Sequence, residues 1–220
     1  MLGRARCVFV IVAGLCLGAS LPVVAAGGSD LVRALTAVAP NLDRTVLRRA
    51  VAAMNCALDR GLERAERLAI IDFSLPSSEQ RLWIFDLSQR ELLLNELVAH
   101  GKGSGQNVAS RFSNVSGSYQ SSIGLFRTSE SYRGRHGYSL RMDGLEAGIN
   151  DLARERAIVI HGADYVDPQW IDRQGRIGRS QGCPAVRQEV ASTVVDTLKD
   201  GQFLFSWYPD PDWLANSDSL

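Results

Sequence analysis

The chain is poor in the residues that build metal and redox sites. Its 220 residues include four cysteines and three histidines, and neither Cys-x-x-Cys nor His-Glu-x-x-His spacing occurs. Cys7 and Cys16 fall near the N-terminus, which leaves Cys56 and Cys183 for the rest of the chain. A zinc site usually draws its Cys and His ligands from closely spaced pairs. We therefore expect no metal site and no cofactor.

After residue 26 the sequence also lacks any apolar run long enough to cross a bilayer. Before that point, Arg4 and Arg6 precede an uncharged apolar stretch at 7–21, and the small residues Ala25 and Ala26 follow it. This order is typical of a secretory signal peptide. We predict a signal peptide at 1–26, export to the periplasm or cell envelope, and no stable membrane insertion after cleavage. An uncleaved N-terminal anchor is the alternative.

Neither sign of charge is in excess, because 24 Lys and Arg residues balance 24 Asp and Glu residues. This balance gives no global attraction to nucleic acid, so we expect no nucleic-acid partner. The oligomeric state stays open. Because an exported chain with two cysteines can form a disulfide, a bond between Cys56 and Cys183 is one alternative. Because Cys56 lies in an apolar helical stretch and Cys183 in a glycine-flanked turn, we favour two separate thiols.

The hydrophobic period divides the remaining chain into a helical segment at 27–67, a strand-rich domain at 68–207 and an acidic, frayed tail at 208–220. We predict a mainly β fold with flanking helices, of the α+β class. Expected helices cover 31–38, a second stretch capped by Asn41 or Asp43, 148–156 and 188–199. Expected strands cover 68–73, 81–86, 91–100, 123–128, 138–142, 157–160 and 202–207. Residues 101–122 form a loop too long for a simple hairpin.

The strongest chemical signal is a histidine and a cysteine set in special backbone contexts. An apolar strand at 157–160 leads to His161, and Cys183 follows 22 positions later, directly after Gly182. A thiolate is the reactive form of cysteine, and a neighbouring imidazole can generate it by accepting the thiol proton. Backbone N–H groups in the turn at 180–183 can stabilise an oxyanion. The pattern predicts cysteine acyl transfer.

This stretch resembles the L,D-transpeptidase catalytic domain, a family of cysteine enzymes that act on bacterial peptidoglycan. His161-Gly162, Ser180 and Gly182-Cys183 match its signature, whereas Gln181 stands where the main family has a second histidine. The closest similarity is to the murein branch with Ser-x-Gly-Cys-Pro-Ala. Further similar stretches are 100–105, 112–114, 121–124 and 144–150.

The resemblance implies a β-sandwich-like domain with an N-terminal helical segment and a cysteine site at one end. It implies Cys183 as nucleophile and His161 as general base and later acid. It also implies that the backbone carbonyl of Ser180 orients the imidazole, and that the N–H groups of Gly182 and Cys183 form the oxyanion hole.

The implied partners are peptidoglycan stem peptides, from which Cys183 would release D-alanine and pass the acyl group to an amine. Alternatives are an L,D-carboxypeptidase of the same fold, a non-catalytic cell-wall binding module, and a cysteine peptidase acting on proteins. The candidate substrate-binding residues, each of which also has an ordinary reading as a turn or surface residue, are His136, Arg179, Ser122, Asn114 and His100.

Overall fold

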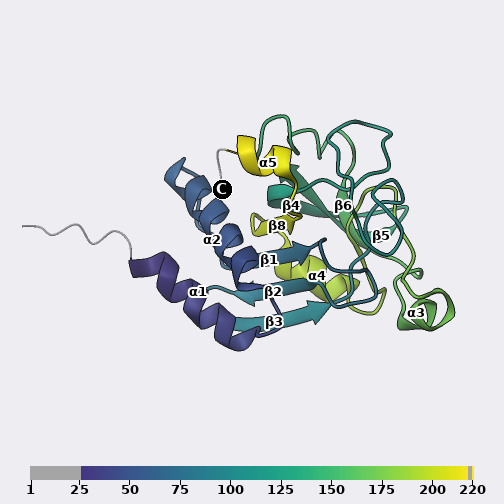
Figure 1. Ribbon diagram of the computed structural model, residues 1–220, viewed down its shortest axis with the longest axis horizontal. Helices are drawn as coiled ribbons and strands as arrows, with labels where there is room; N and C mark the ends of the chain where they lie inside the picture. The colour runs from purple at the N-terminus through teal and green to yellow at the C-terminus, as the bar shows by residue number, and fades with distance from the viewer. Residues whose placement is uncertain (1–25, 218–219) are drawn as a thin grey trace, which may run out of the picture.

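The computed structural model describes residues 26–217 and residue 220 (Figure 1). Its helices are α1 (Ala26–Val38), α2 (Arg44–Asp59), α3 (Pro168–Gln174), α4 (Ala191–Leu198) and α5 (Pro211–Asn216). Its strands are β1 (Arg67–Asp72), β2 (Leu82–Asp86), β3 (Glu91–Glu96), β4 (Gly124–Gly134), β5 (Gly137–Gly144), β6 (Val159–Gly162), β7 (Ala185–Val186) and β8 (Phe203–Trp207).

The eight strands form one mixed sheet in the order β3-β2-β1-β8-β4-β5-β6-β7. Neighbours run antiparallel except for the β1–β8 and β6–β7 pairs, which are parallel. The predicted class, mainly β with flanking helices, is confirmed. The expected sandwich takes the form of a single sheet that bends over itself, because Ile71 and Leu82 from one end share a hydrophobic cluster with Ile160 and Val186 from the other.

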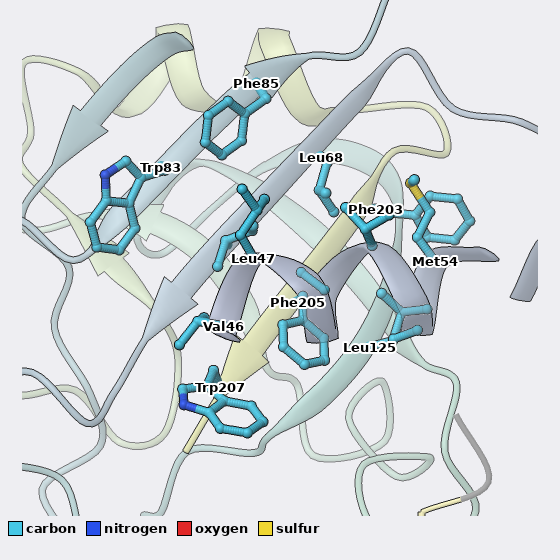
Figure 2. Packing of buried hydrophobic residues seen from close by; sticks show 14 of the residues in the cluster. Val46, Leu47, Met54, Leu68, Trp83, Phe85, Leu125, Phe203, Phe205 and Trp207 are labelled. Atoms are coloured by element: carbon cyan, nitrogen blue, oxygen red, sulfur yellow. The ribbon is translucent and has the colours of Figure 1, made fainter. Parts of the chain in front are cut away.

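The N-terminal helices cover one face of this sheet (Figure 1). Asp43 caps α2 by accepting hydrogen bonds from the backbone N–H groups of Thr45 and Val46, as predicted. The apolar stripe of α2 then packs on the aromatic side chains of the sheet, where Figure 2 shows Leu47 and Met54 among Trp83, Phe85, Phe203 and Phe205. The second face carries α4, whose Val194, Val195 and Leu198 are fully buried.

Two expected features are wrong, and both involve the same buried polar cluster. Residues 148–156 form successive turns rather than a helix, because the Asn150 side chain bonds the Glu146 N–H and the carbonyls of Ile123 and Leu125. The tail is not frayed at 211–216, where α5 buries Trp213 and its indole N–H donates to Glu146 at 2.8 Å. Helix α3, capped by Asp167, was not predicted.

The predicted signal peptide at 1–26 lies, apart from Ala26, outside the described residues. Within the part of the chain that the structure describes, no helix has both the length and the apolar character that crossing a bilayer requires. Cys56 and Cys183 carry thiols rather than a shared disulfide. Cys56 lies on α2, and Cys183 lies next to β7 in a different region of the fold.

Candidate active site

His161 and Cys183 line one cavity of about 510 Å³. The parallel pairing of β6 and β7 brings them together, because His161 is in register with Ala185, two residues beyond Cys183. The 21 residues between them form the connection that carries α3. The other lining residues come from the 117–119 loop, the β4–β5 hairpin and the segments beside β6 and Cys183; they are Gly117, Tyr119, Tyr132, Arg135, His136, Arg156, Ala157, Ile158, Val159, Tyr165, Arg179, Ser180 and Gln181.

The Cys183 thiol is held by the backbone that leads into β6. Its Sγ accepts from the Val159 N–H at 3.4 Å and lies 3.6 Å from the Ala157 carbonyl oxygen. Burial raises the pKa of the Cys183 thiol, because the thiolate loses hydration. The Val159 N–H and the positive charge of Arg156 oppose that rise by favouring the thiolate.

The His161 imidazole is buried in the cavity wall with 3% of the residue exposed. Its Nδ1 lies 2.8 Å from the Gly162 carbonyl oxygen, which can only accept, so Nδ1 carries the proton and Nε2 keeps its lone pair. Burial lowers the pKa of His161, and neighbouring His136 adds to the lowering. The two rings stack with their centroids 4.5 Å apart. The arrangement therefore supplies a neutral imidazole oriented as a proton acceptor.

The expected role of the Ser180 carbonyl is wrong. That carbonyl accepts from the Lys102 N–H at 2.8 Å, and the Gly162 carbonyl orients His161 instead. The Ser180 hydroxyl organises the turn, since it donates to the Cys183 carbonyl at 2.6 Å and accepts from the Gly182 N–H at 3.0 Å. The Gly182 N–H, the other expected oxyanion donor, is engaged by the Ser180 hydroxyl in this geometry. The Cys183 N–H faces its own thiol and no other acceptor among the described residues, so it is a candidate donor to an oxyanion.

Ser180 is also the centre of a Gly-x-Ser-x-Gly sequence at 178–182, a spacing that sequence reasoning wrongly took to be absent. In hydrolases this spacing presents a serine nucleophile on a strand-to-helix turn. Here no helix begins directly after the serine, because the chain continues into β7, and the serine hydroxyl is engaged by the backbone of its own turn. Ser180 is therefore a positioning residue in this site.

The candidate substrate-binding residues separate into two groups. His136 and Arg179 line the cavity with Cys183. Ser122 lies behind it and accepts from Arg156 at 2.5 Å, while Asn114 pairs with Asp151 at 2.7 Å beside a separate surface hollow. The last candidate, His100, is fully buried under the 101–122 loop and does not line the cavity.

Sequence reasoning missed Arg156 and three tyrosines of the cavity wall, Tyr119, Tyr132 and Tyr165. Arg156 lay inside a predicted helix, where an arginine indicates an exposed face. No short motif marks the tyrosines, which come from three separate segments. None of the described residues that line the cavity is Asp or Glu, and no group of three potential metal-ligating side chains occurs among the described residues.

A model of the L,D-transpeptidase catalytic domain matches residues 38–207, which is more than half of the chain. The chain belongs to this family. The match confirms the resemblance given by the His161 and Cys183 motifs. It begins before the predicted catalytic segment and takes in α2. No curated protein sequence matches the chain significantly.

Solved structures with similarity to this member of the family include an L,D-transpeptidase from Mycobacterium smegmatis, at 14% identity and a TM-score of 0.41, covering 66% of this chain and 59% of that one. An L,D-transpeptidase from Stackebrandtia nassauensis has 11% identity and a TM-score of 0.40, with 82% and 77% covered. The transpeptidase LdtMt1, solved in complex with imipenem, has 15% identity and a TM-score of 0.39, with 64% and 59% covered. The chain thus spans about three fifths of the first of these solved chains.

Proposed function

We propose that this protein is an exported peptidoglycan L,D-transpeptidase whose nucleophile is Cys183. The observation that carries the proposal is the placement of His161 and Cys183 on one cavity, with the imidazole proton held on Nδ1 by Gly162. Membership of the catalytic-domain family supports the reaction class.

In the proposed reaction, His161 Nε2 accepts the Cys183 thiol proton as sulfur attacks the carbonyl at the L-centre of the stem-peptide diamino acid. The tetrahedral intermediate collapses, the peptide C–N bond breaks, and the proton held by His161 passes to the departing D-alanine amine. An acceptor amine then attacks the thioester, gives a proton to His161 and displaces the thiol. The Cys183 N–H is the donor available to the oxyanion.

The electrostatics of the cavity favour such a substrate. Arg135, Arg156 and Arg179 line it, and no acidic side chain does so among the described lining residues. A peptidoglycan stem carries several carboxylates, and guanidinium groups bind carboxylates in strong charge-assisted hydrogen bonds. A polypeptide of mixed charge has no equivalent reason to prefer this cavity.

The test is intact-mass and product analysis of the protein without residues 1–26, incubated with purified disaccharide-tetrapeptide. We expect loss of D-alanine, a thioester adduct on Cys183 and a cross-linked dimer, all absent in Cys183→Ala. Cys56→Ala is the matched control and should retain the products. D-Alanine release with water as the sole acceptor would replace transpeptidation by L,D-carboxypeptidation. Glycan binding without product or adduct, from folded and reduced protein, would favour a binding module.

A further inference from the structure

Arg156 holds an unusual position for an arginine that lines a cavity. Its guanidinium donates to the carbonyls of Ser113 and Gln120, the latter at 2.7 Å, and to the hydroxyls of Ser122 and Ser118 at 2.5 and 3.3 Å. All four acceptors are neutral, and no acidic side chain pairs with Arg156 in the described part of the chain. Its positive charge is thus left without a protein counter-ion beside the cavity.

The loop that Arg156 binds also contacts the turn that presents Cys183. The Ser121 hydroxyl donates to the Gly182 carbonyl at 2.9 Å. Gly182 has a φ of 130°, and a Cβ atom there would lie 2.9 Å from the Gln120 carbonyl oxygen, which already accepts from Arg156. Residues 120–122 therefore touch the guanidinium on one side and the nucleophile turn on the other.

The chain on the other side of Arg156 reaches the thiol directly. The Ala157 carbonyl and the Val159 N–H both contact Cys183 Sγ. Ala157 has a φ of 53°, a left-handed conformation that is strained for alanine, so this segment is held in place by its surroundings. Arg156 thus stands between two sets of contacts that converge on Cys183.

We propose that Arg156 is a positioning residue that supplies the fixed positive charge for the Cys183 thiolate and couples that charge to the order of the 113–122 loop. His161 is a poor source of this charge, because its burial and its stack on His136 disfavour the imidazolium. Of the other cavity arginines, Arg179 donates to the Lys102 and Gly105 carbonyls, and Arg135 lies exposed at the tip of the hairpin. The remaining titratable groups of the cavity are Tyr119, Tyr132, His136 and Tyr165.

The inference rests on Cys183 being the reacting group of the proposed function, but its test needs no peptidoglycan. The rate at which iodoacetamide alkylates Cys183, followed by peptide mass analysis across pH, reports the thiolate fraction, because the thiolate displaces iodide. In Arg156→Met we expect the midpoint of the alkylation rate against pH to rise by about one pH unit. At pH values well below that midpoint, alkylation should then be roughly tenfold slower than in the wild type. Arg156→Lys keeps the charge and should shift the midpoint much less.

Two control variants separate charge from loop order. Arg154→Met removes an arginine two positions away that pairs on the surface with Asp143 and Glu130, and it should leave the midpoint unchanged. Ser122→Ala removes one loop acceptor while retaining the cation, and should shift the midpoint less than Arg156→Met. An unchanged midpoint in Arg156→Met, or an equal shift in Ser122→Ala, overturns the proposal. A wild-type protein that alkylates as expected but releases no D-alanine would overturn the proposed function alone.

Discussion

His100 and His161 have the same local sequence, a histidine followed by glycine after an apolar stretch, and both are buried, at 0% and 3% exposure. Their Nδ1 atoms differ in one respect. His100 Nδ1 lies 2.7 Å from a guanidinium nitrogen of Arg81, whereas His161 Nδ1 lies 2.8 Å from the Gly162 carbonyl oxygen. A guanidinium can only donate and a carbonyl can only accept, so the two rings hold opposite tautomers.

The tautomer decides what each histidine can do. His100 carries its proton on Nε2, which is buried near the backbone of Gly105 and Gln106 without a well-formed hydrogen bond in the described structure. Burial, helped by the charge of Arg81, lowers the pKa of His100 to about 3, so the ring stays neutral and structural. His161 presents an Nε2 lone pair and lines the cavity with Cys183. A histidine that acts as a base through Nε2 needs an acceptor at Nδ1, a condition that His161 meets and His100 does not.

Replacing each histidine with glutamine is the most direct test of whether His161 and His100 have different roles. His161→Gln removes the proton acceptor and should lower kcat/KM for D-alanine release by about 10²–10⁴-fold, the usual contribution of a general base. His100→Gln should lower it by less than about threefold in folded protein, since that ring does not reach the cavity. Steady-state kinetics on disaccharide-tetrapeptide measures both. Equal losses in the two variants would show that the tautomers do not separate the roles.

Arg81, the partner of His100, provides a test of the structural role of that site. It is fully buried and donates to the Val98 and Leu75 carbonyls as well as to His100. Arg81→Met leaves these acceptors without donors, so we expect a loss of about 2–4 kcal/mol of unfolding free energy. Urea unfolding measures it, with Arg154→Met as a surface control expected to change stability by less than about 1 kcal/mol. An Arg81→Met protein of unchanged stability would show that burying the Arg81 charge destabilises the fold by as much as its hydrogen bonds stabilise it.

Acid titration tests the neutral state of buried His100 through its effect on stability. The pKa of His100 is about 3 in the fold, against 6.5 for an unperturbed histidine, so between these values the unfolded chain binds a proton that the native state does not. This group therefore contributes stability that is present above about pH 6.5 and is lost as the pH falls, by about 1.4 kcal/mol per unit. His100→Gln should flatten the dependence by about one proton in urea titrations from pH 6.5 to 4. An unchanged slope would show that His100 is protonated in the native state.

Much of the fold and the central pair of the site followed from the sequence, because strand periodicity and glycine-flanked reactive residues are local signals. His161, Cys183 and the strand leading to His161 are of this kind. The contributions that sequence reasoning missed depend on long-range contacts. Asn150 prevents the expected helix by bonding carbonyls more than 20 residues away, and Trp213 orders the tail by donating to Glu146. Such contacts leave no mark on the spacing of neighbouring residues.

The smallest expected effect concerns the ring stacked on His161. His136 comes from the β4–β5 hairpin. Burial is the main cause that lowers the pKa of His161, and the proximity of His136 adds to it, because two stacked imidazoles disfavour a positive charge. His161 should therefore remain neutral at pH values below 6.5, the ordinary pKa of histidine. We expect the fall in kcat/KM on the acidic side of the pH profile to occur below pH 6.5. His136→Phe keeps an aromatic ring in the stack but cannot be charged. It should therefore move the acidic fall in kcat/KM upward by less than about one pH unit, with little change in the maximal kcat/KM.

His136→Ala removes the ring as well, and should also lower the maximal kcat/KM if the stack orients His161. An acidic fall in kcat/KM that stays in place in His136→Phe would show that burial alone sets the protonation of His161, and that the hairpin histidine contributes only shape.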